Sequence, residues 1–303
     1  MVAFNLSIGP GWEIGPGWNL GGGTSPAPGG TWSAGGVMGL ARSGLAGAGT
    51  QTAGLGFGGY AVATTAATEE YDGTAWSAGG NMNTARFGLA GAGTQTAGLA
   101  FGGYNGVASL ADTEEYDGTT WTAGGNMNNA RNQLAGAGTQ SAGLGIAGYT
   151  QGAGGSQPGY TEEYDGSTWT SATNLPGRIF YTPAAGGTQT AGLVFGGQGS
   201  SGYDGSTFSY NGSTWTAGGP MSVARATLAG GGTQTAGLGF GGSAYGTDYA
   251  NTEEYDGSAW TAGGAMGLAR SGLAGAGSQT AGLGFGGYIS GVTAANNTEE
   301  YVK

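Results

Sequence analysis

One tryptophan recurs along the chain at an almost constant spacing. Around each copy the same phrase returns, and its fullest form runs from the hexapeptide 113–118 (Thr-Glu-Glu-Tyr-Asp-Gly) through Trp121 and Met127 to Arg131. A repeat of this length with strand-forming residues inside it indicates a radial or stacked repeat architecture. The six copies, 44 to 48 residues apart, are Trp32, Trp76, Trp121, Trp169, Trp215 and Trp260.

Glycine supplies 74 of the 303 residues, a share that favours disorder in a chain without a pattern. Here the glycines stand at repeated offsets between aromatic and aliphatic residues, so we expect an ordered fold over residues 31–303. Cysteine and histidine are both absent. Their absence excludes disulfides, thiol nucleophiles, Cys/His zinc sites, haem ligation and imidazole chemistry, and we expect no cofactor.

The formal net charge of -11 argues against a nucleic-acid partner, because phosphate binding depends on clustered Lys and Arg. No stretch approaches the roughly 18 apolar residues of a membrane span. The N-terminus lacks the charged region of a secretory signal, so we expect synthesis in the cytoplasm and no membrane insertion. Six of the seven cationic residues stand one per repeat, at Arg42, Arg86, Arg131, Arg178, Arg225 and Arg270.

The unit from residue 87 to residue 128 shows the expected local structure. Its segments 89–93, 95–103, 113–116 and 120–123 predict four short strands. Asp117-Gly118 favours a tight hairpin between the last two, because both residues tolerate a positive φ. Four antiparallel strands per repeat form the blade of a β-propeller.

This pattern resembles the kelch repeat of β-propellers. In that family a double glycine closes the second strand, a tyrosine lies in the third, a tryptophan opens the fourth, and a Met-x-x-x-Arg-like segment leads into the next blade. The matching glycine pairs are 58/59, 102/103, 196/197, 241/242 and 286/287, with Ala147-Gly148 in the remaining unit. The matching tyrosines are Tyr71, Tyr116, Tyr164, Tyr210, Tyr255 and Tyr301.

The two ends of the repeat region complement each other. The chain stops at a third strand, 298–301, and the repeat region starts at a fourth strand, 31–33. We therefore predict an all-β fold: a six-bladed kelch-like β-propeller over residues 29–303, in which the N-terminal strand completes the last blade. Such closure removes the exposed edges of an open sheet.

The repeated residues are expected to serve the scaffold. Trp and Tyr supply the large buried surfaces between blades, and the Glu-Glu pairs beside one Arg per unit are interpreted as inter-blade ion pairs. Paired carboxylates also occur in glycoside hydrolases, but five equivalent copies favour a structural role. Kelch-like oxidases need histidine and a cysteine-modified tyrosine, which this chain lacks. The sequence therefore predicts a protein that is not an enzyme.

Binding residues are expected where the copies differ, in the loops between the second and third strands. Variable loops on a rigid scaffold commonly carry binding residues. Their aromatic, amide and hydroxyl groups suit sugars or a polar protein surface, and the alternative is that these loops are solvated spacers. The candidates are Tyr60, Tyr104, Asn105, Tyr149, Tyr160, Tyr203, Tyr245, Asp248, Tyr249 and Tyr288.

The fourth unit departs from the repeat at residues 175–181. It is one residue shorter between Leu175 and Arg178 and places two aromatic residues near the mouth of the propeller. A local violation of a regular pattern marks a candidate site, here Arg178, Phe180 and Tyr181. A repaired deletion is the alternative.

Residues 1–28 form a segment of different character. Ile-Gly-Pro-Gly-Trp occurs at 8–12 and again at 14–18. We interpret the segment as a docking arm that inserts Trp12 and Trp18 into a partner or a second copy of the chain. The alternative is that it packs on its own propeller.

The wording of the repeat is also similar to kelch-like repeat proteins of marine bacteriophages. That resemblance implies a virion component such as a tail-fibre appendage, whose arm binds other virion proteins and whose propeller contacts a host-surface glycan or protein. The alternative is a structural decoration or adaptor in a virion or filament assembly.

Overall fold

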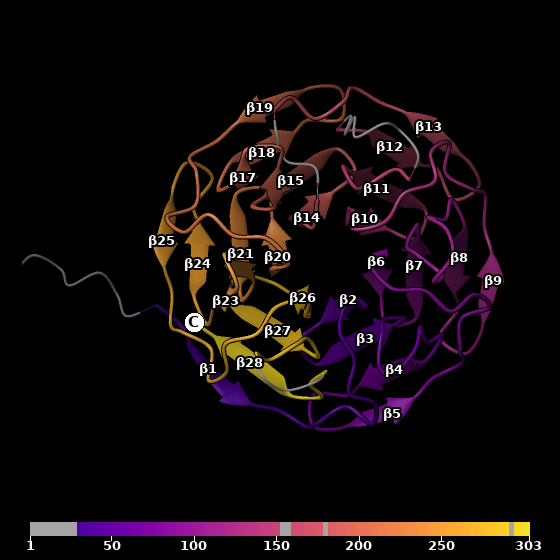
Figure 1. Cartoon of the computed structure of the whole chain (residues 1–303), viewed down its shortest axis with the longest axis horizontal. Coiled ribbons are helices and arrows are strands. Elements are labelled where there is room, and N and C mark those ends of the chain that lie inside the picture. The colour runs from indigo at the N-terminus through magenta and orange to yellow at the C-terminus, as the bar shows by residue number, and fades with distance from the viewer. Residues whose placement is uncertain (1–28, 152–158, 178–180, 291–293) are drawn as a thin grey trace, which may run out of the picture.

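The computed structural model describes residues 29–151, 159–177, 181–290 and 294–303. Six four-stranded antiparallel sheets form a closed ring around a central axis (Figure 1). These residues form strands and no helix, so none of them belongs to a helix that would cross a membrane. The all-β, six-bladed propeller predicted from the repeat is confirmed.

Each blade begins with its innermost strand and ends at the outer rim (Figure 1). Blade 1 consists of β2 (Ala46–Thr50), β3 (Ala53–Phe57), β4 (Thr68–Tyr71) and β5 (Trp76–Ala78). Blade 2 consists of β6 (Ala90–Thr94), β7 (Ala97–Phe101), β8 (Thr113–Tyr116) and β9 (Trp121–Ala123). Blade 3 consists of β10 (Ala135–Thr139), β11 (Ala142–Ile146), β12 (Thr161–Tyr164) and β13 (Trp169–Ser171).

The remaining blades follow the same order. Blade 4 consists of β14 (Ala184–Thr188), β15 (Ala191–Phe195), β18 (Thr207–Tyr210) and β19 (Trp215–Ala217). Blade 5 consists of β20 (Ala229–Thr233), β21 (Ala236–Phe240), β24 (Thr252–Tyr255) and β25 (Trp260–Ala262). Blade 6 consists of β26 (Ala274–Gly277), β27 (Ala281–Phe285), β28 (Thr298–Val302) and β1 (Thr31–Ala34). Two short hairpins, β16 (Gln198–Gly199) with β17 (Gly202–Tyr203) and β22 (Ser243–Ala244) with β23 (Thr247–Asp248), extend connections in blades 4 and 5.

The last blade is shared between the two ends of the described chain. β1 pairs antiparallel with β28, so that Thr31 faces Val302 and Trp32 faces Tyr301. The sheet order β1-β28-β27-β26 therefore matches the order of strands in every other blade. The predicted closure by the N-terminal strand is confirmed.

Small residues let the inner strands approach one another near the axis. A Cβ atom on Gly47 of β2 would lie only 2.6 Å from the carbonyl oxygen of Gly275 in the neighbouring blade. A larger side chain has no room there without a shift of backbone. The alternating Ala and Gly of the first strand are thus a packing requirement, which explains why so glycine-rich a chain is ordered.

The core consists of six clusters, each lying between two neighbouring blades. Between blades 1 and 2 the ring of Phe57 packs 4.9 Å from that of Trp121, whose indole nitrogen donates to Thr68 Oγ1 at 2.9 Å. A buried aromatic ring removes roughly 150–250 Å² from water. At about 25 cal/mol per Å² this contributes at most about 4–6 kcal/mol per ring.

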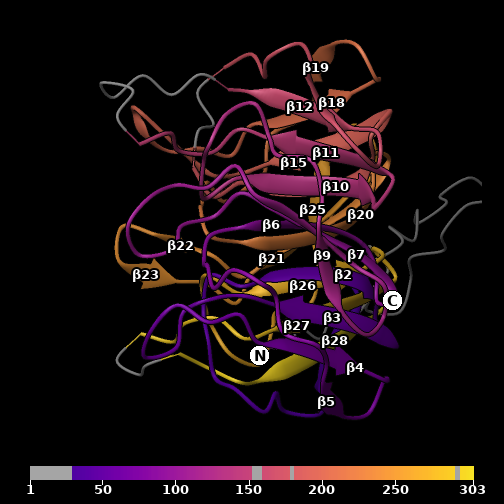
Figure 2. The same ribbon diagram turned by 90° about the vertical axis from the view of Figure 1, so that its right-hand side faces the viewer.

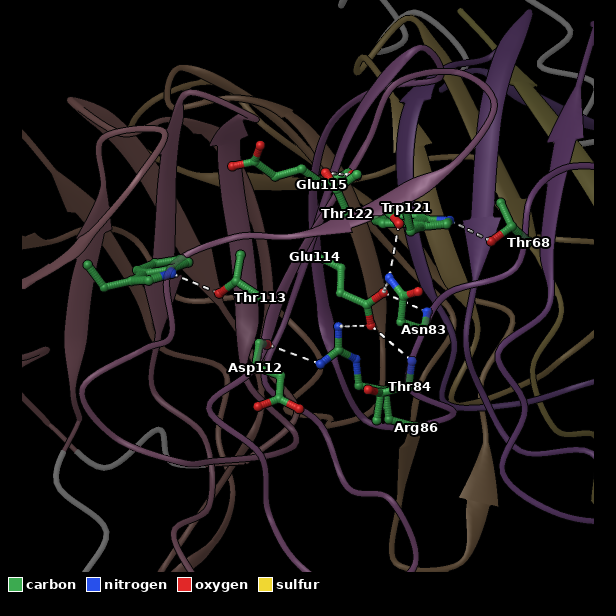
Figure 3. Close-up of polar contacts among 11 residues, drawn as sticks. Thr68, Asn83, Thr84, Arg86, Asp112, Thr113, Glu114, Glu115, Trp121 and Thr122 are labelled. Atoms are coloured by element: carbon green, nitrogen blue, oxygen red, sulfur yellow. Dashed lines mark hydrogen bonds and ion pairs between the residues drawn. The ribbon is translucent and has the colours of Figure 1, made fainter.

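The arginine ion pairs lie within blades, so the prediction that the repeat arginines form inter-blade pairs is wrong. Arg86 precedes blade 2 and its Nη2 lies 3.0 Å from Glu114 Oε1 on β8 of that blade (Figure 3). Burial lowers the pKa of Arg86 while Glu114 raises it, and the guanidinium stays charged. Each of these arginines thus contacts the first Glu of the pair, on the third strand of the blade that it precedes. The same pairing occurs in Arg42–Glu69, Arg131–Glu162, Arg225–Glu253 and Arg270–Glu299.

The second glutamate of each pair makes the contact between blades. The Tyr116 hydroxyl in blade 2 donates to Glu70 Oε1 in blade 1 at 2.5 Å. Burial, followed by this hydrogen bond, raises the pKa of Tyr116 to about 12. Four further tyrosines donate in the same way, in the pairs Tyr71–Glu300, Tyr164–Glu115, Tyr210–Glu163 and Tyr301–Glu254.

Blade 4 lacks both carboxylates. Its third strand, β18, carries Phe208 and Ser209 at the register where the other blades carry the two glutamates. Tyr181 forms the bridge with Gln198 that Phe87 forms with Tyr104. In the other blades an arginine stands directly before this bridging residue, whereas Arg178 stands three positions before Tyr181. The irregular fourth unit thus changes the chemistry beneath the mouth of the ring.

Candidate ligand-binding site

One face of the ring carries both kinds of variable connection, and we call it the loop face. The residue after the repeat arginine bridges to the first residue of the loop between the second and third strands, as in Phe87–Tyr104 and Asn132–Tyr149. The hairpin β22–β23 projects on this face, away from the C-terminal end of the chain (Figure 2). The bridges hold side chains from neighbouring connections at fixed positions around the axis.

Aromatic rings form a continuous row over blades 1 and 2. Phe87 lies between two tyrosines, with its ring centroid 5.6 Å from that of Tyr60 and 5.6 Å from that of Tyr104. A second pair, Tyr149 and Tyr181, lies over blades 3 and 4 with centroids 5.6 Å apart. Tyr60 keeps 44% of its surface exposed, and Phe87 and Tyr104 are partly exposed. The loop face therefore brings several predicted tyrosines together.

A crevice of about 290 Å³ lies between these two aromatic groups, and we call it the blade 2–3 crevice. Asn132 Nδ2 donates to Ser109 Oγ at 2.8 Å, and Gln151 Oε1 accepts from the Ser109 backbone nitrogen at 3.2 Å. These bonds orient the two amides and leave further donor and acceptor capacity on each. The crevice is lined by Phe87, Tyr104, Asn132, Gln133, Tyr149 and Gln151.

A second group of predicted residues lies on the short hairpins of blades 4 and 5. Tyr203 and Tyr245 meet edge-on with centroids 4.9 Å apart, and Tyr245 is 82% exposed. Asp248 Oδ2 accepts from the Ser290 backbone nitrogen at 2.9 Å and borders a shallow cavity of about 440 Å³ with Leu268. This group is separate from the blade 2–3 crevice.

The other predicted loop residues serve the loops themselves. Asn105 Oδ1 accepts from the backbone nitrogens of Val107 and Ala108, both at 2.9 Å, and so shapes its own turn. The ring centroid of Tyr160 lies 5.9 Å from the guanidinium carbon of buried Arg131.

Two further predicted tyrosines take up different positions. The backbone of Tyr249 joins the double glycine of blade 5 to the arginine entering blade 6, through bonds to Gly242 and Arg270. Tyr288 is 44% exposed and bridges to Ser271. The predicted residues Arg178, Phe180, Trp12 and Trp18 lie outside the described residues.

Sequence reasoning missed Phe87, Asn132, Gln133 and Gln151. The candidates were sought in the loops between the second and third strands, whereas Phe87, Asn132 and Gln133 stand one or two positions after the repeat arginine. The signal was present, because the two positions after that arginine read Ser-Gly, Phe-Gly and Asn-Gln in successive units. Variation in the connections between blades is as informative as variation within them.

The loop face carries no exposed cation among the described residues. The arginines at 42, 86, 131, 225 and 270 are wholly buried in ion pairs. Lys303 pairs with Glu254 and lies beside Thr280, at a turn on the opposite face. Within the described ranges, no group of three or more acidic residues is placed to hold a metal ion.

Comparisons with known proteins show the fold. No known family pattern matches the chain, and no curated protein sequence is similar to it. Among solved structures, the propeller is similar to that of YjhT, with a TM-score of 0.74 and 13% identity over 86% of this chain and 95% of YjhT. A likeness at this identity shows a shared architecture.

The exclusion of an enzyme is corrected. That exclusion depended on the missing histidine and cysteine and on the scaffold role of the repeated carboxylates. The likeness to YjhT argues against excluding an enzyme. The missing residues exclude imidazole and thiol chemistry alone. Carboxylates and tyrosine hydroxyls act as acids, bases and nucleophiles without either.

Proposed function

We propose that the protein binds a saccharide in the blade 2–3 crevice of its loop face. The observation that carries the proposal is the joint lining of one crevice by two tyrosines, a phenylalanine and three amides. Sugar rings offer apolar C–H faces and a rim of hydroxyls. Aromatic side chains contact the former at low entropic cost, and amides hydrogen-bond the latter as donor and acceptor.

The setting we propose is the surface of a virion, where the propeller contacts a host-surface glycan. Support comes from the resemblance of the repeat to kelch-like proteins of marine bacteriophages, and from the sequence of residues 1–28, which differs in character from the repeats that follow it. In this proposal residues 1–28, with Trp12 and Trp18, bind other virion proteins. Particles that incorporate a chain lacking residues 1–28 at the normal level would contradict the role of the arm.

A saccharide-binding assay tests the proposed site. Wild-type protein and the variants Tyr104→Ala and Tyr149→Ala are applied to a glycan array and to purified surface polysaccharide, and the same sugars are assayed for cleavage. We expect each substitution to weaken binding about tenfold or more, because it removes a ring from the crevice.

Tyr245→Ala is the matched control, since this tyrosine is exposed on the same face but does not line the crevice. It is expected to bind like wild type. Equal binding by all four proteins, or no binding of any saccharide, rejects the proposal. In that case the structural role in an assembly becomes the better description of the ring.

A further inference from the structure

A closed ring of backbone hydrogen bonds surrounds the propeller axis on the loop face. The residue two positions after each arginine, or its counterpart in blade 4, donates its N–H to the same residue of the preceding blade. The six residues are Gly44, Gly88, Gln133, Thr182, Thr227 and Gly272, joined by N–H···O distances from 2.6 to 3.1 Å. Each ring residue donates its N–H to one neighbour and accepts at its C=O from the other, so the donors that the ring offers to a ligand come from side chains.

The ring is chemically divided into two halves. All six residues have a positive φ, from 49° at Thr182 to 61° at Gly44. Glycine suits this backbone and occupies it in blades 6, 1 and 2, whereas blades 3, 4 and 5 carry Gln133, Thr182 and Thr227. A side chain in the left-handed region is unfavourable, and such strain concentrates at functional sites. Three consecutive blades keep polar side chains where glycine would fit more easily.

These side chains line a cavity of about 200 Å³ on the axis, which we call the axial pocket. Neither the Gln133 amide nor the Thr182 hydroxyl forms a hydrogen bond with any described residue, so both have their capacity free. The Thr227 hydroxyl donates to the Ala226 carbonyl and meets Ser243 Oγ at 3.0 Å. The pocket therefore offers uncharged hydrogen-bonding groups on one side and glycine on the other, above apolar side chains that include one leucine from each blade except blade 4.

The axial pocket adjoins the blade 2–3 crevice. Phe87 and Gln133 line both cavities. Small-molecule sites usually enclose roughly 300–1,000 Å³, a range that neither cavity reaches alone and the two reach together. One ligand that fills both would lie across Phe87 with its end on the axis.

The charges of the described residues around the mouth favour an uncharged ligand. The described part of the loop face has no exposed Lys or Arg, whereas Asp204 and Asp248 lie on its hairpin loops. Carboxylate, phosphate and sulfate groups are bound mainly by arginine and lysine. Among the described residues of this face, an acidic sugar would lose its hydration and find no exposed cation in return.

We propose that the axial pocket is a second subsite, in which Gln133, Thr182 and Thr227 bind the hydroxyl-bearing end of a neutral glycan whose next sugar lies in the blade 2–3 crevice. The inference rests on the proposed saccharide binding and adds two statements to it: the ligand is uncharged, and its terminal sugar binds in the axial pocket.

The variants Gln133→Gly and Thr182→Gly test the subsite without endangering the fold, because glycine is the residue that three other blades use in the ring. Binding of neutral di- to hexasaccharides of hexoses and N-acetylhexosamines is measured by calorimetry, beside counterparts that contain uronic or sialic acid. We expect each variant to bind the neutral sugars roughly three- to tenfold more weakly. Their melting temperatures should equal or exceed that of wild type, since the strained side chain is gone.

Ala147→Gly is the control. Ala147 also has a positive φ, 55°, is buried, and lines neither cavity. It is expected to bind like wild type. Unchanged affinity in Gln133→Gly and Thr182→Gly, with Tyr104→Ala defective, overturns the axial subsite and leaves the proposed function standing.

Acidic sugars that bind as well as neutral ones overturn the inference that the ligand is uncharged. Absence of binding to any saccharide overturns both proposals together. Neutral sugars bound in preference, and weakened by glycine at either ring position, support the axial subsite.

Discussion

Tyrosine hydroxyls join neighbouring blades, and their protonation sets an alkaline limit on stability. Burial raises the pKa of Tyr71, Tyr116 and Tyr164 to about 12, with a further contribution from the hydrogen bond to a glutamate of the preceding blade. The unfolded value is about 10. Between pH 10 and pH 12 the unfolded chain releases protons that the folded chain keeps, so the free energy of unfolding falls as the pH rises. Below pH 10 this contribution is fully present.

We predict that Tyr116→Phe destabilises the protein at pH 7 and flattens its alkaline loss of stability. The variant removes a hydrogen bond to a charged group, which contributes about 1.5–3 kcal/mol. Denaturant unfolding at pH 7 and melting curves from pH 8 to pH 12 measure the two effects.

Tyr255→Phe is the matched control, because Ser209 stands where the other blades offer a carboxylate. Burial again raises the pKa of Tyr255, but without a glutamate. We expect a smaller loss at pH 7 than in Tyr116→Phe. Equal losses in the two variants would show that the inter-blade hydrogen bond contributes nothing of its own.

At the scale of the element, the double glycine at the end of the second strand is held by its backbone conformation and by its close neighbours. Gly102 has a φ of 64°, and a Cβ atom there would lie 2.7 Å from the carbonyl oxygen of Arg131. The glycine pair follows β7 and contacts the segment that leads into the next blade, because the Gly103 N–H donates to the Arg131 carbonyl at 2.9 Å. In blade 3 the first position is Ala147, with a φ of 55°.

We predict opposite effects for two exchanges at this position. Gly102→Ala places a side chain in the left-handed region and against backbone, at a cost of roughly 1–3 kcal/mol. Ala147→Gly relieves the same strain, partly offset by the greater freedom of glycine in the unfolded chain. Denaturant unfolding of both variants checks the signs. A Gly102→Ala protein as stable as wild type would contradict the steric account.

The blade could be predicted from the sequence because its residues act locally or once per repeat. Asp117-Gly118 gave the hairpin, and Asp117 Oδ1 indeed accepts from the backbone nitrogens of Thr119 and Thr120. The partners of Glu114 and Glu115 could not be predicted, because the repeat places an arginine near both and only the three-dimensional path decides between them. Gln133 was missed for a related reason: its role depends on a ring built from all six blades.

At the scale of the whole molecule, six similar interfaces share the work of holding the ring. Each of these inter-blade clusters combines a tryptophan and a tyrosine from one blade with aliphatic residues and a phenylalanine from the neighbouring blade. No single cluster is a central core. Opening one interface therefore leaves the other five interfaces and the sheets of the individual blades intact. The ring is closed only when all six interfaces form, including the one that β1 completes by pairing with β28.

The closure by β1 gives the sharpest prediction at this scale. Trp32 packs 4.8 Å from the ring of Phe240 in blade 5, and its indole nitrogen donates to Thr252 Oγ1 at 2.8 Å. Deletion of residues 29–34 uncovers these groups and leaves β28 as an exposed edge. We expect a loss of several kcal/mol, since about 4–6 kcal/mol is the upper value for one buried ring. We also expect concentration-dependent association through the open edge.

A circular permutant separates closure from mere loss of a strand. Because Thr31 lies opposite Val302, β28 and β1 can be joined by a tight Asp-Gly turn like those of the other blades, with new ends at Val107, a loop residue that is 78% exposed. This protein keeps every strand and every interface, so its melting temperature should equal or exceed that of wild type. Calorimetry and light scattering on the deletion and the permutant decide the matter. A deleted chain that melts like wild type and stays monomeric would mean that the shared blade does not hold the ring closed.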